Sequence, residues 1–338
     1  MTTSVRDGSA LLMELHDGFI RARALQLAAE LQIADLLSDG PRSTDDLATA
    51  TATDSRSLYR LLRLLAGCGI VSEVEPRSFA VTATGAHLQG DHPQSVKATL
   101  LSAGLFHPVY ADAMHSLRTG EPAFPKTFGK PLFDYLKDHP EQATLFNGAM
   151  ADASRLETAA LLEAFDFSGA RGIVDVGGGT GTLLGAVLSA YPQSTGVVYD
   201  LPHLAAEAAA KAEAAGVADR LTFTGGDFFQ EVPAGGDLYL LKSIVHDWPD
   251  EDAVRILRGC RRAMSPQSRL LLIERVLPPG DDDHPGKAMD ITLLVVLGGR
   301  ERTEDEYSAL LAEAGFRLTG VTPTASPMSV VEAVPVQD

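Results

Sequence analysis

The sequence predicts an α/β protein with a seven-stranded, Rossmann-like sheet that ends in an antiparallel hairpin, preceded by a mainly helical N-terminal unit. Five short apolar runs alternate with helical segments after residue 170, which is typical of parallel strands joined by helices. These runs are 172–176, 196–200, 221–225, 238–242 and 269–274. The last two runs, 316–323 and 328–335, are separated only by Thr324-Ala-Ser-Pro327, which is too short for a helical crossover and indicates a hairpin.

The region before the sheet has the pattern of a winged helix. Residues 11–37 are strongly apolar, Ser43-Thr-Asp-Asp46 is typical of a helix start, and residues 55–66 continue the helical pattern. Two short runs, 70–74 and 78–82, are expected to pair as the wing. We therefore predict a winged-helix unit over 1–95, connecting helices over 96–168, and the sheet domain over 169–338.

The charge of the chain argues against a nucleic-acid partner. Winged helices often bind DNA, and Arg56, Arg60 and Arg63 lie on one predicted helix, but a net charge of -17 would repel a phosphate backbone. The unusual apolarity of the first helix fits a dimer interface better. We expect a homodimer through residues 1–95.

The composition predicts a cytoplasmic protein that has no membrane partner. Apolar residues make up 45% of the chain, yet no apolar run approaches the ~20 residues that a membrane span needs. The first residues lack the apolar stretch of a secretory signal. Cys68 and Cys260 lie in apolar helical patterns, and we expect both thiols to be reduced.

A glycine-rich turn follows the first strand, in Ile173-Val-Asp-Val-Gly-Gly-Gly-Thr-Gly-Thr-Leu-Leu184. Such a turn presents bare backbone to a nucleoside-containing cofactor. Its Gly-x-Gly-x-Gly spacing resembles that of S-adenosylmethionine-dependent methyltransferases, whereas a dinucleotide site has Gly-x-Gly-x-x-Gly. Asp200 closes the second strand, suitably for a ribose, and Asp227 and Phe228 follow the third, suitably for adenine. The acidic lining tolerates a sulfonium, so we predict S-adenosylmethionine.

Three titratable residues lie close to the ends of predicted strands or helices in the later part of the sheet domain. His246 follows the fourth strand, just before Pro249 and three acids that suit the first turn of a helix. Glu274 ends the fifth strand, and Glu301 precedes the last helical segment. A lone histidine is more often structural, but ligands bind at this edge of such a sheet, and the two acids favour a functional role.

Over nearly its whole length the chain resembles the dimeric small-molecule O-methyltransferases of the caffeate/hydroxyindole kind, including bacterial relatives that modify antibiotics and pigments. The motifs that carry the resemblance are Asp175-Val-Gly-Gly-Gly-Thr-Gly181, Tyr199-Asp-Leu-Pro-His203, Gly226-Asp-Phe-Phe229, His246-Asp-Trp248, Glu274 and Gly298-Gly-Arg-Glu-Arg-Thr303. In that family the winged-helix unit forms an intertwined dimer and contributes to the partner's substrate pocket.

The resemblance implies roles for the matching residues. His246 is the general base, and Glu274 and Glu301 orient its ring. A neutral imidazole suits this role because a phenol, with a pKa of about 10, is a poor nucleophile at neutral pH. No metal is expected, and Asp281-Asp-Asp-His284 has the pattern of a solvated loop. The implied cofactor-binding residues are Gly177, Gly179, Asp200, Leu201, Asp227, Phe228 and Lys242.

Aromatic and methionine residues are the candidates for the substrate pocket. Met150 is the first choice, because Leu145-Phe-Asn-Gly-Ala-Met-Ala-Asp-Ala-Ser154 resembles a family segment whose methionine packs on the substrate ring. The apolar run 291–297 replaces a polar contact of the phenylpropanoid enzymes and favours a larger, flatter acceptor. The further candidates are Phe106, Tyr110, Phe146, Asn147, Met289 and Asp290.

We predict methyl transfer from S-adenosylmethionine, with S-adenosylhomocysteine as product, to a phenolic hydroxyl of a polyketide- or quinone-like metabolite. Alternatives on the same scaffold are N- or C-methylation, and decarboxylation or hydroxylation. An NAD-dependent oxidoreductase and a winged-helix regulator are less consistent with the glycine spacing and the charge.

Overall fold

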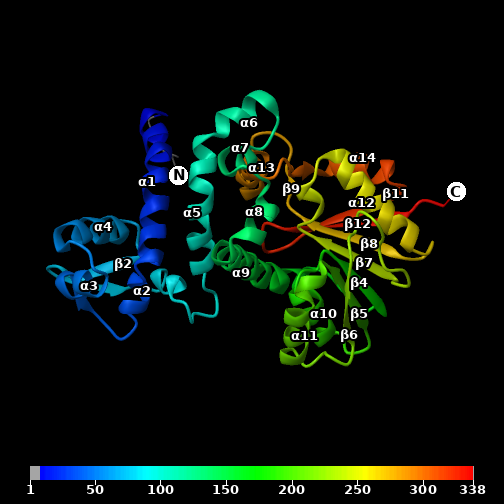
Figure 1. Cartoon of the computed structure of the whole chain (residues 1–338), viewed down its shortest axis with the longest axis horizontal. Coiled ribbons are helices and arrows are strands. Elements are labelled where there is room, and N and C mark those ends of the chain that lie inside the picture. Colours follow the sequence, from blue (N-terminus) through cyan, green and yellow to red (C-terminus); the bar gives the residue numbers. More distant parts are fainter. Residues whose placement is uncertain (1–7, 338) are drawn as a thin grey trace, which may run out of the picture. The chain divides into compact units, whose positions relative to one another are not determined.

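The protein, described by a computed structural model over residues 8–337, divides into two compact units. One unit is Met1–His107 with His139–Ala153, and the other is Pro108–Asp138 with Ser154–Asp338. Helices α5 (Lys97–Ala111) and α9 (Pro140–Ala164) each run from one unit into the other (Figure 1). The boundaries at residues 95 and 168 stay predictions.

The first unit contains a helical cluster and a small antiparallel sheet. Its core joins Ile33 and Leu47 to Leu62 and Phe79. The elements before α5 are α1 (Gly8–Glu30), α2 (Ile33–Leu36), β1 (Arg42–Ser43), α3 (Thr44–Ala50), α4 (Ser55–Gly67), β2 (Val71–Glu75), β3 (Ser78–Val81) and η1 (Gly85–Leu88).

Two local features of this unit differ from the pattern in the sequence. The helical pattern over 11–37 is interrupted at Gln32, whose φ of 54° lies in the left-handed region, so that α1 ends at Glu30 and α2 begins at Ile33. The wing has a third strand, because the two residues of β1 pair with β3 in the order β1-β3-β2. A strand of two residues is too short to show the alternating pattern by which strands are recognised in a sequence.

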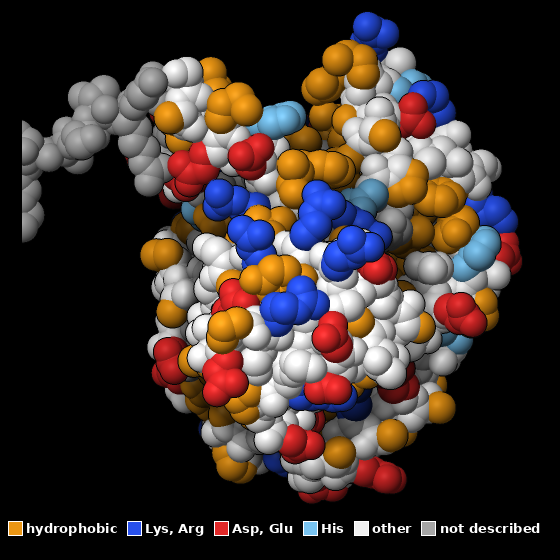
Figure 2. All heavy atoms as spheres, turned by 90° about the vertical axis from the view of Figure 1, so that its left-hand side faces the viewer, with side chains coloured by type: hydrophobic (Ala, Val, Ile, Leu, Met, Phe, Trp, Pro, Cys, Tyr) orange, Lys and Arg blue, Asp and Glu red, His pale blue; other side chains and the backbone are white. Residues whose placement is uncertain are grey.

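The surface of the first unit carries apolar and basic side chains. Helix α1 exposes large apolar side chains, with Phe19 71% and Leu12 68% accessible. Helix α4 exposes Arg56, Arg60 and Arg63, and Figure 2 shows Lys and Arg side chains gathered on the face that it draws. The expectation that no nucleic acid binds there stays a prediction.

The second unit is built on a seven-stranded mixed sheet. Its order is β11-β12-β8-β7-β4-β5-β6, with β12 antiparallel to both neighbours and the other pairs parallel. The C-terminal hairpin is confirmed. The strands are β4 (Gly172–Val176), β5 (Thr195–Asp200), β6 (Leu221–Gly225), β7 (Leu238–Lys242), β8 (Arg269–Glu274), β11 (Phe316–Pro323) and β12 (Ser329–Pro335), and β9 (Val276–Leu277) pairs separately with β10 (Arg302–Thr303).

Helices cover both faces of this sheet (Figure 1). Strand β8 serves both layers, since Leu270 and Leu272 enter one core and Leu271 and Ile273 the other. The remaining helices are α6 (Ala113–Thr119), α7 (Ala123–Phe128), α8 (Leu132–Asp138), α10 (Thr182–Ala190), η2 (Pro202–Leu204), α11 (Ala205–Ala214), η3 (Val245–Asp247), α12 (Asp250–Ala263), α13 (Pro285–Val296) and α14 (Glu304–Glu313). Within the described residues, no helix has the length and apolarity to cross a membrane.

Candidate active site

The glycine turn after β4 needs glycine for two physical reasons. Gly177 has a φ of 71°, and a Cβ built there would lie 2.4 Å from Cδ1 of Ile244. Its N–H donates to the carbonyl oxygen of Tyr199 at 2.8 Å. Gly179 has a φ of 59° and open space beside it, because a Cβ there would meet no atom within 4 Å. The turn therefore offers accessible backbone at the carboxyl edge of the sheet.

The carboxylate of Asp200 is tied to this turn. Its Oδ2 accepts the N–H of Gly179 at 2.7 Å, and its Oδ1 accepts the N–H of Leu201 at 2.6 Å. The predicted neighbours Gly179, Asp200 and Leu201 thus form one hydrogen-bonded group. These bonds leave lone pairs on both oxygens, so the carboxylate can still accept a hydroxyl.

Three aromatic side chains lie in contact with one another beside the same turn. The ring of Phe228, which follows β6, lies 3.7 Å from the Cβ position of Gly177. Its ring centroid is 5.0 Å from that of Phe229 and 6.1 Å from that of Trp248. Asp227 is exposed beside it and accepts the N–H of Phe229 at 2.9 Å through Oδ1. The structure thus brings the predicted Phe228 to the glycine turn.

Asp175 is a buried acid that the sequence showed only as part of the turn motif. It is 1% exposed, and neither carboxylate oxygen has a hydrogen-bond partner among the described residues. Burial, assisted by the charge of Asp200 and opposed by Lys242, raises the pKa of Asp175 to about 7. The sequence did carry one sign of this buried acid, because Asp175 is the single acid in an otherwise apolar strand.

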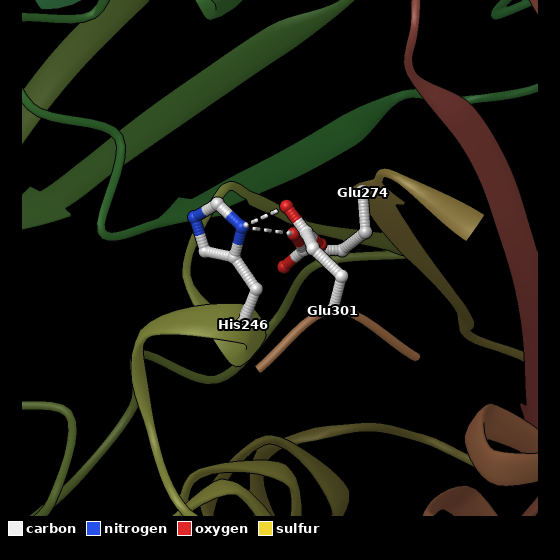
Figure 3. A group of neighbouring side chains, drawn as sticks. All are labelled: His246, Glu274 and Glu301. Atoms are coloured by element: carbon white, nitrogen blue, oxygen red, sulfur yellow. Dashed lines mark hydrogen bonds and ion pairs between the residues drawn. The ribbon is translucent and has the colours of Figure 1, made fainter. Parts of the chain in front are cut away.

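His246 is held on η3 with two carboxylates on one side of its ring (Figure 3). Nδ1 lies 3.1 Å from Oε1 of Glu301, a hydrogen bond, and 3.6 Å from Oε2 of Glu274. The side chain of His246 is 8% exposed and those of both glutamates 0%. The sequence expectation that these three residues converge is met in the structure; their catalytic role is taken up below.

The second ring nitrogen of His246 faces an acid that sequence reasoning missed. Nε2 lies 3.3 Å from Oδ1 of Asp247, the next residue. Burial lowers the proton affinity of His246, but the charges of Glu274, Glu301 and Asp247 outweigh it and raise its pKa to about 9. For the two acids the effect of burial has the opposite sign. It raises the pKa of Asp247 to about 6 and that of Glu274 to about 7, while the charge of His246 opposes both shifts. These groups titrate as one coupled cluster.

The backbone around His246 is fixed by buried polar contacts. Glu274 accepts the N–H groups of Ile244 at 3.1 Å and Val245 at 2.9 Å through Oε1. The fully buried guanidinium of Arg302 donates to the carbonyl oxygens of Val245 at 3.1 Å and Trp248 at 3.0 Å. These bonds hold both sides of the short helix that carries the imidazole.

Comparison with known proteins identifies the family. Residues 110–317 match the O-methyltransferase domain, and residues 13–89 match the O-methyltransferase dimerisation domain. The chain belongs to the O-methyltransferase family. It is an S-adenosylmethionine-dependent O-methyltransferase, as the resemblance implied.

Several similar proteins are bacterial O-methyltransferases. The phenazine O-methyltransferase of Lysobacter antibioticus is 41% identical, with 99% of this chain and 100% of that protein covered. The O-demethylpuromycin-O-methyltransferase of Streptomyces alboniger is 43% identical, with 94% and 87% covered. The crystal structure of LaPhzM is 42% identical with a TM-score of 0.92, covering 97% of this chain and 99% of that one.

Other relatives have names that describe different chemistry. An 8-amino-8-demethylriboflavin N,N-dimethyltransferase of Streptomyces davaonensis is 38% identical, with 92% of this chain and 91% of that protein covered. An aclacinomycin 10-hydroxylase of Streptomyces purpurascens is 34% identical, with 98% and 92% covered. The family scaffold therefore supports more than one acceptor or reaction.

The residues at the glycine turn of the methyltransferase fit S-adenosylmethionine. Gly179 leaves open space at the turn, and the carboxylate of Asp200 supplies negative charge for a cationic ligand. Lys242, at the end of β7, is not a free cation, because its Nζ lies 2.6 Å from Oε2 of the buried Glu157. Sequence reasoning did not find Glu157, which lies three residues after the segment that ends at Ser154 and belongs to no motif named there.

The predicted acceptor contacts are divided between the two units of the methyltransferase. In the first unit, the rings of Phe106 and Phe146 meet edge to face at 6.5 Å, and Asn147 and Met150 are exposed. In the second unit, the exposed Tyr110 bonds through its hydroxyl to Oγ1 of Thr292 at 2.8 Å, and Met289 is half-buried. Asp290 also contacts the loop of Glu301, since its Oδ1 accepts the N–H of Glu301 at 2.8 Å, and its predicted place in the pocket stays a prediction.

His246, Glu274 and Glu301 are also a group of metal-ligand type. One ligand atom from each lies within 4.8 Å of the others. The hydrogen bond between Nδ1 and Glu301 is the arrangement of an oriented base, and we assign the three residues no ion. That the reaction needs no metal stays a prediction.

Proposed function

We propose that this methyltransferase transfers the methyl group of S-adenosylmethionine to a phenolic hydroxyl of a polyketide- or quinone-like aromatic molecule, with His246 as general base. The observation that carries this proposal is the arrangement of the imidazole, with Nδ1 bonded to Glu301 and Nε2 directed away from both glutamates (Figure 3). The names of the phenazine and O-demethylpuromycin enzymes support an aromatic hydroxyl as acceptor.

The glycine turn and its acids are the proposed cofactor site. Gly177 and Gly179 present backbone, the carboxylate of Asp200 accepts the ribose hydroxyls, and Asp227 and Phe228 take the adenine. Leu201 and Lys242 complete the proposed contacts. When bound, S-adenosylmethionine supplies a methyl group on a positively charged sulfur. Asp175 is buried at the same edge of the sheet and ionises only as the pH rises through about 7.

His246 accepts the proton of the acceptor hydroxyl at Nε2 as the oxygen becomes a nucleophile. Glu301 accepts the N–H at Nδ1, which fixes the tautomer and stabilises the imidazolium that forms. Glu274 adds a second negative charge and holds the backbone of η3. Proton transfer by a positioned base typically contributes ~10²–10⁴-fold to a rate.

A His246→Gln variant tests the base. Its turnover should fall by ~10²–10⁴-fold, because the amide cannot accept the proton. The dissociation constant for S-adenosylmethionine, measured by isothermal titration calorimetry, should change less than threefold, since the glycine turn is untouched. Turnover equal to that of the wild type contradicts the role of His246.

An amino group is the second candidate acceptor, supported by the N,N-dimethyltransferase relative. C-methylation, decarboxylation and hydroxylation remain the wider alternatives on the scaffold. The product decides among them. Reaction with an aminophenol should add one methyl by mass spectrometry, and NMR should place it on oxygen; a methyl group on nitrogen contradicts the phenolic assignment.

We also propose that the protein works as a homodimer through its first unit. The dimerisation-domain match and the exposed apolar side chains of α1 support this arrangement. Met150 is the proposed contact to the acceptor ring, with Phe106, Phe146, Asn147, Tyr110 and Met289 as further contacts. Contribution of partner residues to the pocket, which the family resemblance implies, belongs to the same proposal.

A further inference from the structure

Two buried charged residues lie between Lys242 and Glu301. Glu157 is on the part of α9 that belongs to the second unit, and Arg275 directly follows β8. The carboxylate of Glu157 pairs with Nζ of Lys242 at 2.6 Å and with Nη2 of Arg275 at 3.0 Å. The side chain of Glu157 is 7% exposed, and those of both cations are 13% exposed.

The ion pairs continue from Arg275 to the proposed base. Nη1 of Arg275 lies 3.8 Å from Oε1 of Glu301, and the same oxygen is 3.1 Å from Nδ1 of His246. We call Lys242, Glu157, Arg275, Glu301 and His246 the charge chain. Its signs alternate from Lys242 to Glu301, so each inner charge has an opposite charge on both sides. Such pairing offsets the large cost of burying ions.

We propose that Arg275 is a positioning residue for the base and that Glu157 holds it in place. Through Glu301, the pair would keep a carboxylate on Nδ1 of His246 and set the proton affinity of the imidazole. This inference rests on the proposed role of His246. It assigns functions to two residues that contact neither the glycine turn nor the imidazole directly.

The charges around the imidazole explain why a cation at this place matters. His246 faces Asp247 on η3, Glu274 on β8 and Glu301 before β10. The guanidinium of Arg302 pairs with Asp250 and donates hydrogen bonds to backbone carbonyls. Arg275, in contact with Glu301, therefore offsets part of the negative field that favours the imidazolium.

The charge chain predicts that variants of Arg275 and Glu157 shift the titration midpoint of His246 in opposite directions. Replacing the cation in Arg275→Met strengthens the negative field and should raise the titration midpoint of His246 by about one pH unit. Replacing the anion in Glu157→Gln should lower the midpoint. The measurement is NMR of protein with ¹³C-labelled histidine, without cofactor, with the His246 signal identified by its loss in His246→Gln.

Two further variants separate charge from structure. Arg275→Lys keeps the positive charge, so its midpoint should stay within a few tenths of a pH unit of the wild type. Arg269→Met is the matched control. Arg269 is the first residue of β8, the strand that Arg275 follows, and it pairs with Glu332, which is not part of the charge chain. This variant should leave both the midpoint and the turnover unchanged.

The pH profile of kcat/KM provides the second readout. In Arg275→Met its rising limb should move to higher pH with the NMR midpoint, while a merely structural role would lower the rate at every pH. A midpoint of His246 that is unchanged in folded Arg275→Met, or that moves the same way in both variants, overturns the inference. If Arg275→Met does not fold, an unchanged or raised midpoint in Glu157→Gln overturns it.

The same data distinguish this inference from the proposed function. If the NMR midpoints shift with opposite signs but the pH profiles do not move, the charge chain stands and the base role of His246 fails. If His246→Gln abolishes turnover but the midpoints do not shift, the base role stands and the charge chain fails.

Discussion

His246 titrates among three acids, and its raised pKa has a direct consequence for activity. A base must be neutral to accept a proton, and the carboxylates around His246 raise its pKa to about 9 against the opposing effect of burial. Below that pKa the imidazole is protonated, so kcat/KM should rise as the pH increases from neutral toward about 9. Initial rates at low acceptor concentration measure this profile. A flat profile over that range contradicts it, and the residual rate of His246→Gln should lack the rising limb.

Asp175 makes stability depend on pH. Burial raises its folded-state pKa to about 7 from an ordinary value of 3.8, so the folded protein binds a proton that the unfolded chain has lost. The stability that the protonated Asp175 contributes is fully present below pH 3.8 and is lost as the pH rises through 7. The free energy of unfolding falls by on the order of 4 kcal/mol over that range. Asp175→Asn should therefore show a smaller difference in Tm between pH 5 and pH 8 than the wild type.

Thermal unfolding without cofactor measures the effect of Asp175. The exposed Asp219 is a suitable control, because Asp219→Asn should leave the pH dependence of Tm unchanged. An Asp175→Asn protein whose Tm falls as steeply as that of the wild type would show that the ionisation of Asp175 does not limit stability.

At the scale of elements, the loop before β10 is packed directly against η3. A Cβ built at Gly299 would lie 2.0 Å from the carbonyl oxygen of His246, so the two backbones approach as closely as glycine permits. Gly299→Ala should push the loop, and Glu301 with it, away from the imidazole. We expect kcat to fall by ~10²-fold, the typical effect of a displacement of about 1 Å.

Gly320→Ala is the control for this loop, because a Cβ at Gly320 would meet no atom within 4 Å. It should keep the wild-type kcat. Circular dichroism and Tm establish that both variants are folded. Wild-type kcat in Gly299→Ala would show that the loop can yield without disturbing the base.

The sheet was predictable from the sequence because each strand carries its own apolar run. Strands β4, β6, β7 and β8 begin and end where the runs do. His246 and Glu274 could be placed at one edge of the sheet because each lies at or just beyond the end of a strand, whereas the place of Glu301 beside them came from the family resemblance. Contacts such as those of Glu157 and Arg275 were not predictable, because partners 118 residues apart leave no local pattern. The same holds for Asp247, whose approach to Nε2 depends on the turn of η3.

At the scale of the whole molecule, the exposed apolar surface of α1 supports the proposed homodimer. Leu12, Leu15 and Phe19 are each more than 60% exposed, an unfavourable surface for a monomer. Light scattering should give twice the chain mass of 35.8 kDa. A Leu15→Asp/Phe19→Asp variant should shift toward the monomer, because a charge buried in an apolar interface is costly.

Val336, exposed at the opposite end of the chain, provides the control for the dimer. Val336→Asp should leave the measured mass unchanged. A wild-type protein that elutes as a monomer at micromolar concentration contradicts the homodimer, whatever the behaviour of the variants.

The position of β12 has a consequence for synthesis on the ribosome. This strand lies inside the sheet, between β11 and β8, and its Ser329 pairs with Glu274. Until residues 329–335 have left the exit tunnel, β8 keeps an unpaired edge and Glu274 lacks its neighbouring strand. A nascent chain can therefore fold its N-terminal unit early, but its catalytic pocket matures only after translation of the final strand.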